Sequence, residues 1–125
     1  MPHILLVKDT QIVADALRET LELEGWHVET CADGRAALRL IESEGHFDLF
    51  LLDNELPNVS GLELTRRARR VAHREGTPVV VISASECGRD ARRAGADAFI
   101  RKPQDVWRMV EIIARLLNAS VAEGD

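Results

Sequence analysis

The sequence predicts one α/β domain built on a doubly wound, five-stranded parallel sheet with helices on both faces. Two patterns predict it. Apolar runs of strand length alternate about five times with segments in which apolar residues recur at helical spacing. The strand-like runs are continuous rather than alternately polar, which is typical of parallel strands buried on both faces. The length of 125 residues suits a single domain closed around one hydrophobic core.

The first half of the chain contains three predicted strands separated by two predicted helices. Residues 4–7 form the first strand, residues 26–31 the second, and residues 47–52 the third, which stops at Asp53. The helix between the first two strands ends at Gly25, and its apolar stripe consists of Ile12, Val13, Ala16, Leu17 and Leu21. The second helix carries Ala36, Leu40 and Ile41. Each helix therefore has one apolar side to place against the sheet.

The second half begins with a loop at residues 57–61. Ser60 and Glu63 have the spacing of a capping box and open a third helix. Strands cover residues 78–82 and 98–100, and the helix between them is weak because Gly88 lies inside it. The last helix has an apolar stripe of Val106, Met109, Val110, Ile113, Leu116 and Leu117. We expect one domain over residues 1–125, with a core at 3–118 and a frayed tail at 119–125.

The charge distribution favours a protein as the binding partner. Residues 1–60 carry 12 acidic and four basic side chains, whereas residues 61–125 carry nine acidic and 12 basic ones. An acidic first half and a basic second half favour oriented docking to a protein more than binding to nucleic acid. The sequence also has neither a recognition helix nor aromatic residues placed between basic ones, as nucleic-acid binding would need. No apolar run approaches the ~20 residues that span a bilayer, and no basic leader precedes the first strand. We therefore expect a cytoplasmic protein with no membrane partner, in which Cys31 and Cys87 are reduced.

Charged and hydroxyl side chains follow the predicted strands at their carboxyl ends. They are Lys8, Asp9, Asp53, Ser83 and Lys102. Open parallel sheets bind ligands outside the carboxyl ends of their strands. We therefore expect these five residues, which are scattered in the sequence, to converge in space.

The residue types at this edge suit the transfer of a phosphoryl group. A carboxylate that ends a buried strand, such as Asp53, is costly unless it is paired or used. Asp9 would lie beside it, and a hard cation such as Mg²⁺ would relieve the repulsion between them. Lys102 offers an ammonium group and Ser83 a hydroxyl to the same oxygens, so the set describes a carboxylate nucleophile that accepts a phosphoryl group. The simpler alternative is an ion pair between Lys102 and Asp53 that only ties two strands together.

Four short motifs, in this order, resemble the receiver domain of bacterial response regulators, of the chemotaxis-response-regulator kind. They are Ile4-Leu5-Leu6-Val7-Lys8-Asp9, Leu51-Leu52-Asp53-Asn54-Glu55-Leu56-Pro57 followed by Gly61, Val81-Ile82-Ser83-Ala84, and Lys102-Pro103. Each motif is weak alone, but together they cover essentially residues 3–118. The resemblance implies a flavodoxin-like strand order of 2-1-3-4-5 and a function in two-component, or phosphorelay, signalling.

The resemblance also implies a role for each residue of the edge. Asp53 would be the phosphoacceptor, and Asp9, Asp53 and the backbone carbonyl of Glu55 would bind Mg²⁺. Ser83 would be the switch hydroxyl, Phe99 the switch aromatic, and Lys102 the lysine that contacts the phosphoryl group, followed by a cis bond before Pro103. The implied partners are a histidine kinase or phosphotransfer protein and a downstream output domain or protein, and no enzymatic turnover is expected.

Lys8 is the main departure from the family pattern. It stands where the family usually has an acid that holds metal-bound water, so we expect Mg²⁺ binding to be weakened. Its ammonium group either reaches Asp53 and competes with the metal, or it extends to water or pairs with Glu55.

Two further departures fall on the surface that receivers use for output. The segment between Ser83 and Lys102 is about one helical turn short, which leaves only Cys87, Ala91 and Ala94 to face inward from its helix. Gln104 stands where a hydrophobic residue is usual. Both changes argue against a standard dimer through this surface.

Three functional hypotheses follow. The leading one is a phosphoacceptor receiver that relays a histidine-kinase signal. The second is a pseudo-receiver, a phosphorylation-independent protein-interaction module in which Lys8 stands in for the metal. The third is a small phosphotransferase or hydrolase, because Asp53-Asn54-Glu55 resembles an acid-x-acid catalytic pair, although a phosphate-cradling glycine-rich loop is missing.

Two surface features are also predicted. Trp107 is expected to be partly exposed and to mark a contact surface. The basic side chains of the third and fourth helices are expected to form solvated faces, with docking of an acidic partner as the alternative; they are Arg66, Arg67, Arg69, Arg70, Arg74, Arg89, Arg92 and Arg93.

Overall fold

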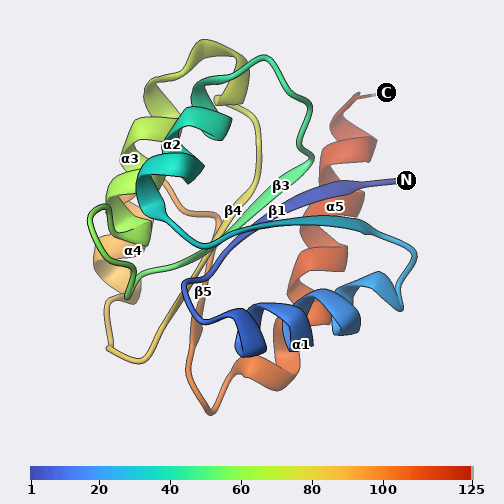
Figure 1. Ribbon diagram of the computed structural model, residues 1–125. Helices are drawn as coiled ribbons and strands as arrows, with labels where there is room; N and C mark the ends of the chain where they lie inside the picture. The colour runs from blue at the N-terminus through green and yellow to red at the C-terminus, as the bar shows by residue number, and fades with distance from the viewer. Residues whose placement is uncertain (125) are drawn as a thin grey trace.

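The strands form one parallel sheet in the order β2-β1-β3-β4-β5, which confirms the predicted fold class (Figure 1). The structure is a computed structural model that describes the backbone of residues 1–124 and the side chains of residues 1–119. The strands are β1 (His3–Val7), β2 (His27–Cys31), β3 (Leu49–Asp53), β4 (Val79–Ser83) and β5 (Ala98–Arg101). All five lie within one or two residues of their predicted positions.

Helices cover both faces of the sheet, as Figure 1 shows. Helices α1 (Gln11–Glu22) and α5 (Met109–Gly124) cover one face. Helices α2 (Gly34–Glu42), α3 (Gly61–Arg70) and α4 (Gly88–Ala94) cover the other. One short 3₁₀ helix, Ala72–Arg74, follows α3, and another, Val106–Arg108, precedes α5.

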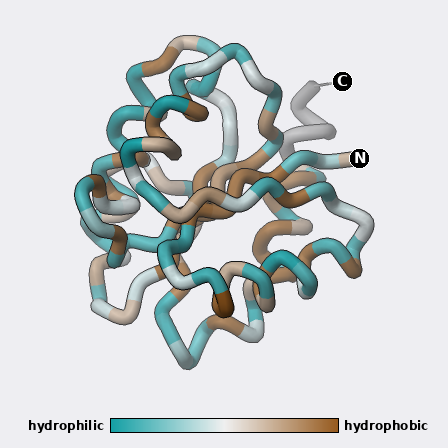
Figure 2. Tube along the Cα trace, viewed as in Figure 1, coloured by the Kyte–Doolittle hydropathy of each residue, from teal (hydrophilic) through white to brown (hydrophobic). Residues whose placement is uncertain are grey.

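The continuous apolar runs of the sequence supply two separate cores. In β1, Ile4 and Leu6 pack with Ile113 of α5, whereas Leu5 and Val7 pack with the side chains of α2 and α3. Burial of each such side chain contributes about 1.5–3 kcal/mol. The resulting apolar centre is visible as the brown strands of Figure 2. A rigid sheet buried on both faces therefore fixes the positions of the residues that follow its strands.

Helix α1 turns a different side to the sheet than its sequence predicted. Ile12 is 82% exposed, and Val13 and Ala16 are exposed as well, so their predicted inward orientation is wrong. The helix instead packs through Ala14, Leu17 and Leu21, which are three and four residues apart and form their own stripe. Two overlapping apolar stripes were available, and packing against the sheet selected one of them.

The last two helices begin and end as follows. Helix α4 has seven residues and begins at Gly88, where a Cβ would lie 3.1 Å from the ring of Phe99. Helix α5 continues to Gly124, so the backbone of the expected tail is helical as far as this residue. Asp125 lies outside the described residues. Within residues 1–124, we find no helix with the length and apolar composition needed to cross a membrane.

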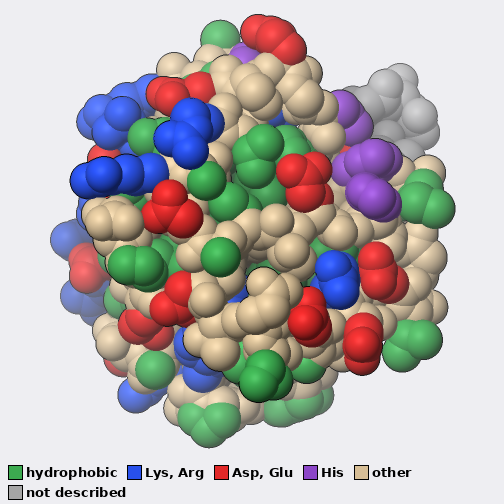
Figure 3. Space-filling model, in the orientation of Figure 1, with side chains coloured by type: hydrophobic (Ala, Val, Ile, Leu, Met, Phe, Trp, Pro, Cys, Tyr) green, Lys and Arg blue, Asp and Glu red, His purple; other side chains and the backbone are tan. Residues whose placement is uncertain are grey.

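The basic helices are only partly solvated. Arg74 is 3% exposed, and its guanidinium donates to backbone carbonyls that include those of Ile41 and Gly45. Arg69 donates to the carbonyls of Gly95 and Thr77. The prediction of a solvated face is therefore wrong for these two arginines, because backbone carbonyls rather than water accept their hydrogen bonds. Other basic side chains gather on the surface of α3 and α4, as Figure 3 shows.

Candidate functional site

The carboxyl ends of four strands bring the predicted site residues together. Asp53 is the last residue of β3 and Ser83 the last of β4, and in the register of the sheet Asp53 pairs with Ile82. Ser83 in turn pairs with Arg101, so Lys102 begins the next loop beside it. Lys8 follows β1, the neighbour of β3. The predicted convergence at one edge of the sheet is therefore seen.

Two ammonium groups bind the carboxylate of Asp53, which is only 3% exposed. Its Oδ2 accepts hydrogen bonds from Lys8 Nζ at 2.5 Å and Lys102 Nζ at 3.1 Å, while its Oδ1 accepts one from the amide of Glu55 at 2.8 Å. Burial raises the pKa of the Asp53 carboxyl, but hydrogen bonds from Lys8, the Glu55 amide and Lys102 outweigh it and lower the pKa below its ordinary value. Asp53 is therefore held as a carboxylate.

Lys8 lies inside the site and bridges its two aspartates. Its side chain is 13% exposed, and Nζ lies 2.5 Å from Asp53 and 3.5 Å from Asp9 Oδ1. Of the two expectations for Lys8, the contact with Asp53 is confirmed, and the alternative of extending to water or pairing with Glu55 is wrong. Burial lowers the pKa of the Lys8 ammonium, but the hydrogen bond and charge of Asp53 outweigh it, so the net pKa is raised.

The carboxylate of Glu55 binds Ser83 and Ala84, two contacts that the sequence pattern did not predict. Its Oε2 accepts a hydrogen bond from the Ser83 hydroxyl at 2.6 Å, and its Oε1 accepts one from the amide of Ala84 at 2.7 Å. Lys102 Nζ lies 3.7 Å from the same Oε1. The only sequence signal for this arrangement was an acid two residues after Asp53, at the edge where Ser83 was expected.

The loop between β3 and α3 is fixed by short-range contacts. A Cβ at Gly61 would lie 2.7 Å from the carbonyl oxygen of Asp53, so this close approach requires glycine. The side-chain oxygen of Asn54 accepts a hydrogen bond from the amide of Leu62 at 3.0 Å. Ser60 caps α3 by accepting from the amide of Glu63 at 3.1 Å, which confirms the Ser60 half of the predicted capping box, whereas the Glu63 carboxylate accepts from Arg66. The Lys102–Pro103 bond is cis, as the resemblance implied.

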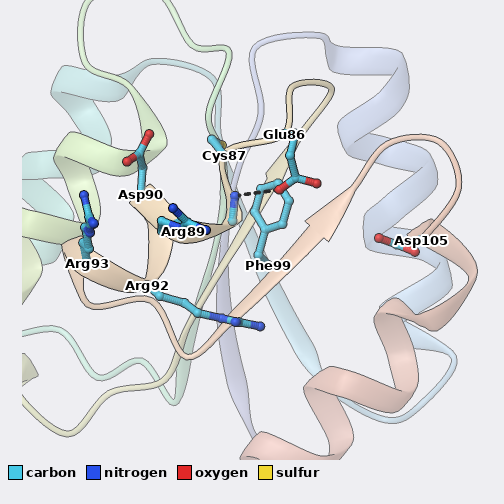
Figure 4. Close-up of a pocket in the computed structure, with 9 residues that line it drawn as sticks. Glu86, Cys87, Arg89, Asp90, Arg92, Arg93, Phe99 and Asp105 are labelled. Carbon is cyan, nitrogen blue, oxygen red and sulfur yellow. Dashed lines mark hydrogen bonds between the residues drawn. The ribbon is translucent and has the colours of Figure 1, made fainter.

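Phe99 lines a groove beside the start of α4 (Figure 4), and Asp53 is not among the residues that line this groove. Its half-buried ring packs beside Gly88, and the amide of Gly88 donates to Glu86, another residue of the groove, at 3.1 Å. Gln104 is exposed, and Trp107 is 77% exposed on the nearby 3₁₀ helix. The structure thus places Ser83 at the site and Phe99 on the adjoining surface.

The oxygen atoms at this edge suit a hard cation, but Lys8 already supplies a positive charge there. Asp9, Asp53 and the carbonyl of Glu55 offer the oxygen donors that Mg²⁺ prefers. In the described part of the chain, no group of three or more His, Cys, Asp or Glu side chains is placed to hold a metal ion. The Lys8 ammonium lies between the two aspartates, so these donors fit a metal only after Lys8 moves away.

Comparison with known proteins shows which family this chain resembles in sequence and in structure. A family model described as "Response regulator receiver domain" matches residues 4–114. Response regulator ArlR of Staphylococcus aureus is 35% identical over 121 residues, which cover 94% of this chain and 53% of ArlR. The chain thus spans about half the length of the curated relatives it matches.

Solved structures agree over nearly the whole chain. A CheY-like response regulator receiver domain protein of Methanospirillum hungatei is 32% identical, with a TM-score of 0.88 and 98% of each chain covered. Response regulator TrrA of Thermotoga maritima, solved in complex with Mg²⁺-BeF, is 29% identical, with a TM-score of 0.81 over 93% of this chain and 99% of TrrA.

Proposed function

Because the chain belongs to the response regulator receiver family, we propose that it accepts a phosphoryl group on Asp53 and relays a histidine-kinase signal. As a receiver domain, it is a signalling module of two-component systems rather than a classical enzyme. The observation that carries the proposal is the buried Asp53 carboxylate, held ionised at a strand end with Ser83 and Lys102 beside it. We further propose that it acts in the cytoplasm, without direct binding to nucleic acid.

The proposed reaction is a displacement at phosphorus. An oxygen of Asp53 attacks the phosphorus of a phosphohistidine on a kinase or phosphotransfer protein. The new O–P bond forms as the P–N bond breaks, and the imidazole leaves with the bonding pair and takes up a proton from water. Lys102, 3.1 Å from Asp53, would bind a phosphoryl oxygen. Mg²⁺, held by Asp9, Asp53 and the Glu55 carbonyl, would neutralise negative charge on the reacting groups.

Ser83 and Phe99 are proposed to pass the signal to a downstream domain or protein. A phosphoryl group can shift a two-state equilibrium only through contacts that differ between the states, and the Ser83 hydroxyl is the candidate contact. Because α4 is short and Gln104 is exposed, a standard dimer through this face is not expected.

Intact mass after treatment with acetyl phosphate and Mg²⁺ tests the assignment of Asp53. We expect the wild type to gain about 80 Da, the mass of one phosphoryl group, and Asp53→Asn to gain nothing. An adduct of the same mass on the variant would refute the assignment.

The contact between Lys8 and Asp53 favours a second candidate function, a phosphorylation-independent interaction module. In that case the ammonium at 2.5 Å would keep Asp53 permanently neutralised. Beryllofluoride with Mg²⁺ separates the two functions, because a phosphoacceptor should bind this phosphoryl analogue and show amide shifts at Ser83, whereas a pseudo-receiver should not respond.

A further inference from the structure

Three hydrogen-bond donors at the site converge on a single carboxylate, that of Glu55. The hydroxyl of Ser83 lies 2.6 Å from Oε2, the amide of Ala84 lies 2.7 Å from Oε1, and the ammonium of Lys102 lies 3.7 Å from the same oxygen. We call these three donors the oxyanion cradle.

The cradle is built to hold an anion. Ser83 is fully buried, and its Oγ accepts a hydrogen bond from the amide of Ser85 at 3.0 Å, which directs its own proton toward Glu55. Hydrogen bonds to a charged acceptor are roughly twice as strong as neutral ones. The cradle therefore binds the Glu55 carboxylate with two hydrogen bonds and one nearby positive charge.

One of the three donors, the ammonium of Lys102, also binds Asp53. Lys102 spans the gap, since its Nζ is 3.1 Å from Asp53 Oδ2 and 3.7 Å from Glu55 Oε1. An anionic group attached to Asp53 would need donors to its oxygens, and the Ser83 hydroxyl and the Ala84 amide are already engaged by Glu55. A carboxylate presents two oxygens and one negative charge, whereas a phosphoryl group presents three oxygens and about two charges.

We propose that the Glu55 side chain is the internal ligand of the oxyanion cradle, which it occupies in the unphosphorylated chain and leaves when a phosphoryl group on Asp53 takes its place. The identity of the incoming group rests on the proposed function above. Glu55 is a positioning residue in this arrangement, because it holds Ser83 and Ala84 before any phosphoryl group arrives. Its side chain is 40% exposed, so it can swing into solvent without disturbing the core.

Removal of the side chain should turn the cradle into a binding site for a free anion. Glu55→Ala deletes the carboxylate but keeps the backbone carbonyl and the amide that binds Asp53. The matched control is Glu86→Ala, which removes a 68% exposed carboxylate from the same edge of the sheet without touching the cradle. Each protein is titrated with inorganic sulfate, without Mg²⁺, while the amide signals of Ser83 and Ala84 are followed by NMR.

We expect Glu55→Ala to bind sulfate at least about tenfold more tightly than the wild type or Glu86→Ala, because only this variant removes the acceptor of the Ser83 hydroxyl and the Ala84 amide. Adding Ser83→Ala should abolish the gain. Equal sulfate affinity in all proteins would overturn the proposal, as would an Ala84 amide signal that does not move when Glu55 is replaced.

Hydrogen exchange on the wild type tests the same contact without a variant. Ala84 is an exposed residue, so its amide should exchange fast unless Glu55 protects it. Fast exchange would also overturn the proposal. Neither experiment requires Asp53 to react. If Glu55→Ala binds sulfate tightly but the wild type cannot be phosphorylated, the proposed function is refuted and the role of Glu55 in the cradle still stands.

Discussion

Replacement of Lys8 tests how this receiver manages the charge around Asp53. The Lys8 ammonium lies 2.5 Å from Asp53 and 3.5 Å from Asp9, the two side chains proposed to hold Mg²⁺. Lys8→Asp would remove that cation and restore an acid where the family usually has one. The acidic and basic side chains of the site, which are Lys8, Asp9, Asp53, Glu55 and Lys102, would change in net formal charge from −1 to −3.

The distances set the scale of the effect. At an effective dielectric constant near 20, two unit charges 2.5 Å apart attract each other by about 6–7 kcal/mol. Much of this attraction is offset by the hydration that the Lys8 ammonium gains when it leaves Asp53. Only a fraction of the attraction energy therefore opposes the binding of Mg²⁺. A net opposition of about 1.4 kcal/mol already corresponds to a tenfold change in affinity. We therefore expect Lys8→Asp to raise the Mg²⁺ affinity by at least about tenfold.

Without metal, the same variant should be less stable than the wild type. Three carboxylates besides Asp53 would then crowd one pocket, and one charge-assisted hydrogen bond to Asp53 would be lost. The loss of a hydrogen bond to a charged group costs about 1.5–3 kcal/mol, which lowers the melting temperature of a domain of this size by roughly 5–12 °C.

Calorimetric Mg²⁺ titration and thermal melts with and without Mg²⁺ measure both effects. Lys8→Met serves as the control, because it removes the ammonium without adding a ligand and should fall between the wild type and Lys8→Asp in metal affinity. Unchanged metal affinity and an unchanged metal-free melting temperature in Lys8→Asp would show that Lys8 does not compete with the metal.

Three further outcomes are expected. Ser83→Ala should still allow phosphorylation but uncouple it from Phe99, so phosphorylation-induced amide shifts near Phe99 that match the wild type would contradict the switch. Because the pKa of Asp53 is lowered in the folded protein, its carboxylate stabilises the fold above pH ~4, and this contribution is lost as the pH falls through the folded-state pKa. Because the pKa of Lys8 is raised, its ammonium stabilises the fold below pH ~10, and this contribution is lost as the pH rises through the folded-state pKa. The melting-temperature gap between the wild type and Lys8→Met should thus shrink below pH ~4, and a constant gap would speak against the ion pair. Gly61→Ala should cost about 1–3 kcal/mol in chemical denaturation, because its Cβ would lie 2.7 Å from the Asp53 carbonyl, and an unchanged midpoint would show that the loop relaxes freely.

The sequence alone determined the sheet and the location of the site. Continuous apolar runs such as residues 4–7 and 79–82 have few alternatives to a strand buried on both faces, so strand positions followed from local pattern. Once parallel strands are assigned, their carboxyl ends must share one edge. Asp53, Ser83 and Lys102 were therefore expected at the same edge whatever their separation along the chain, and the strand order that the family resemblance implied made them neighbours.

Only the tertiary structure decided which partner each side chain binds. Lys8 had Asp53, Glu55 and water within reach, and the outcome depended on how deeply Asp53 is buried. Glu55 turned its carboxylate to Ser83 and Ala84, and Ile12 turned to solvent when α1 packed through Ala14 instead. A long side chain can adopt several conformations of similar energy, each with a different partner. Contacts between residues distant in the sequence decide which conformation it adopts.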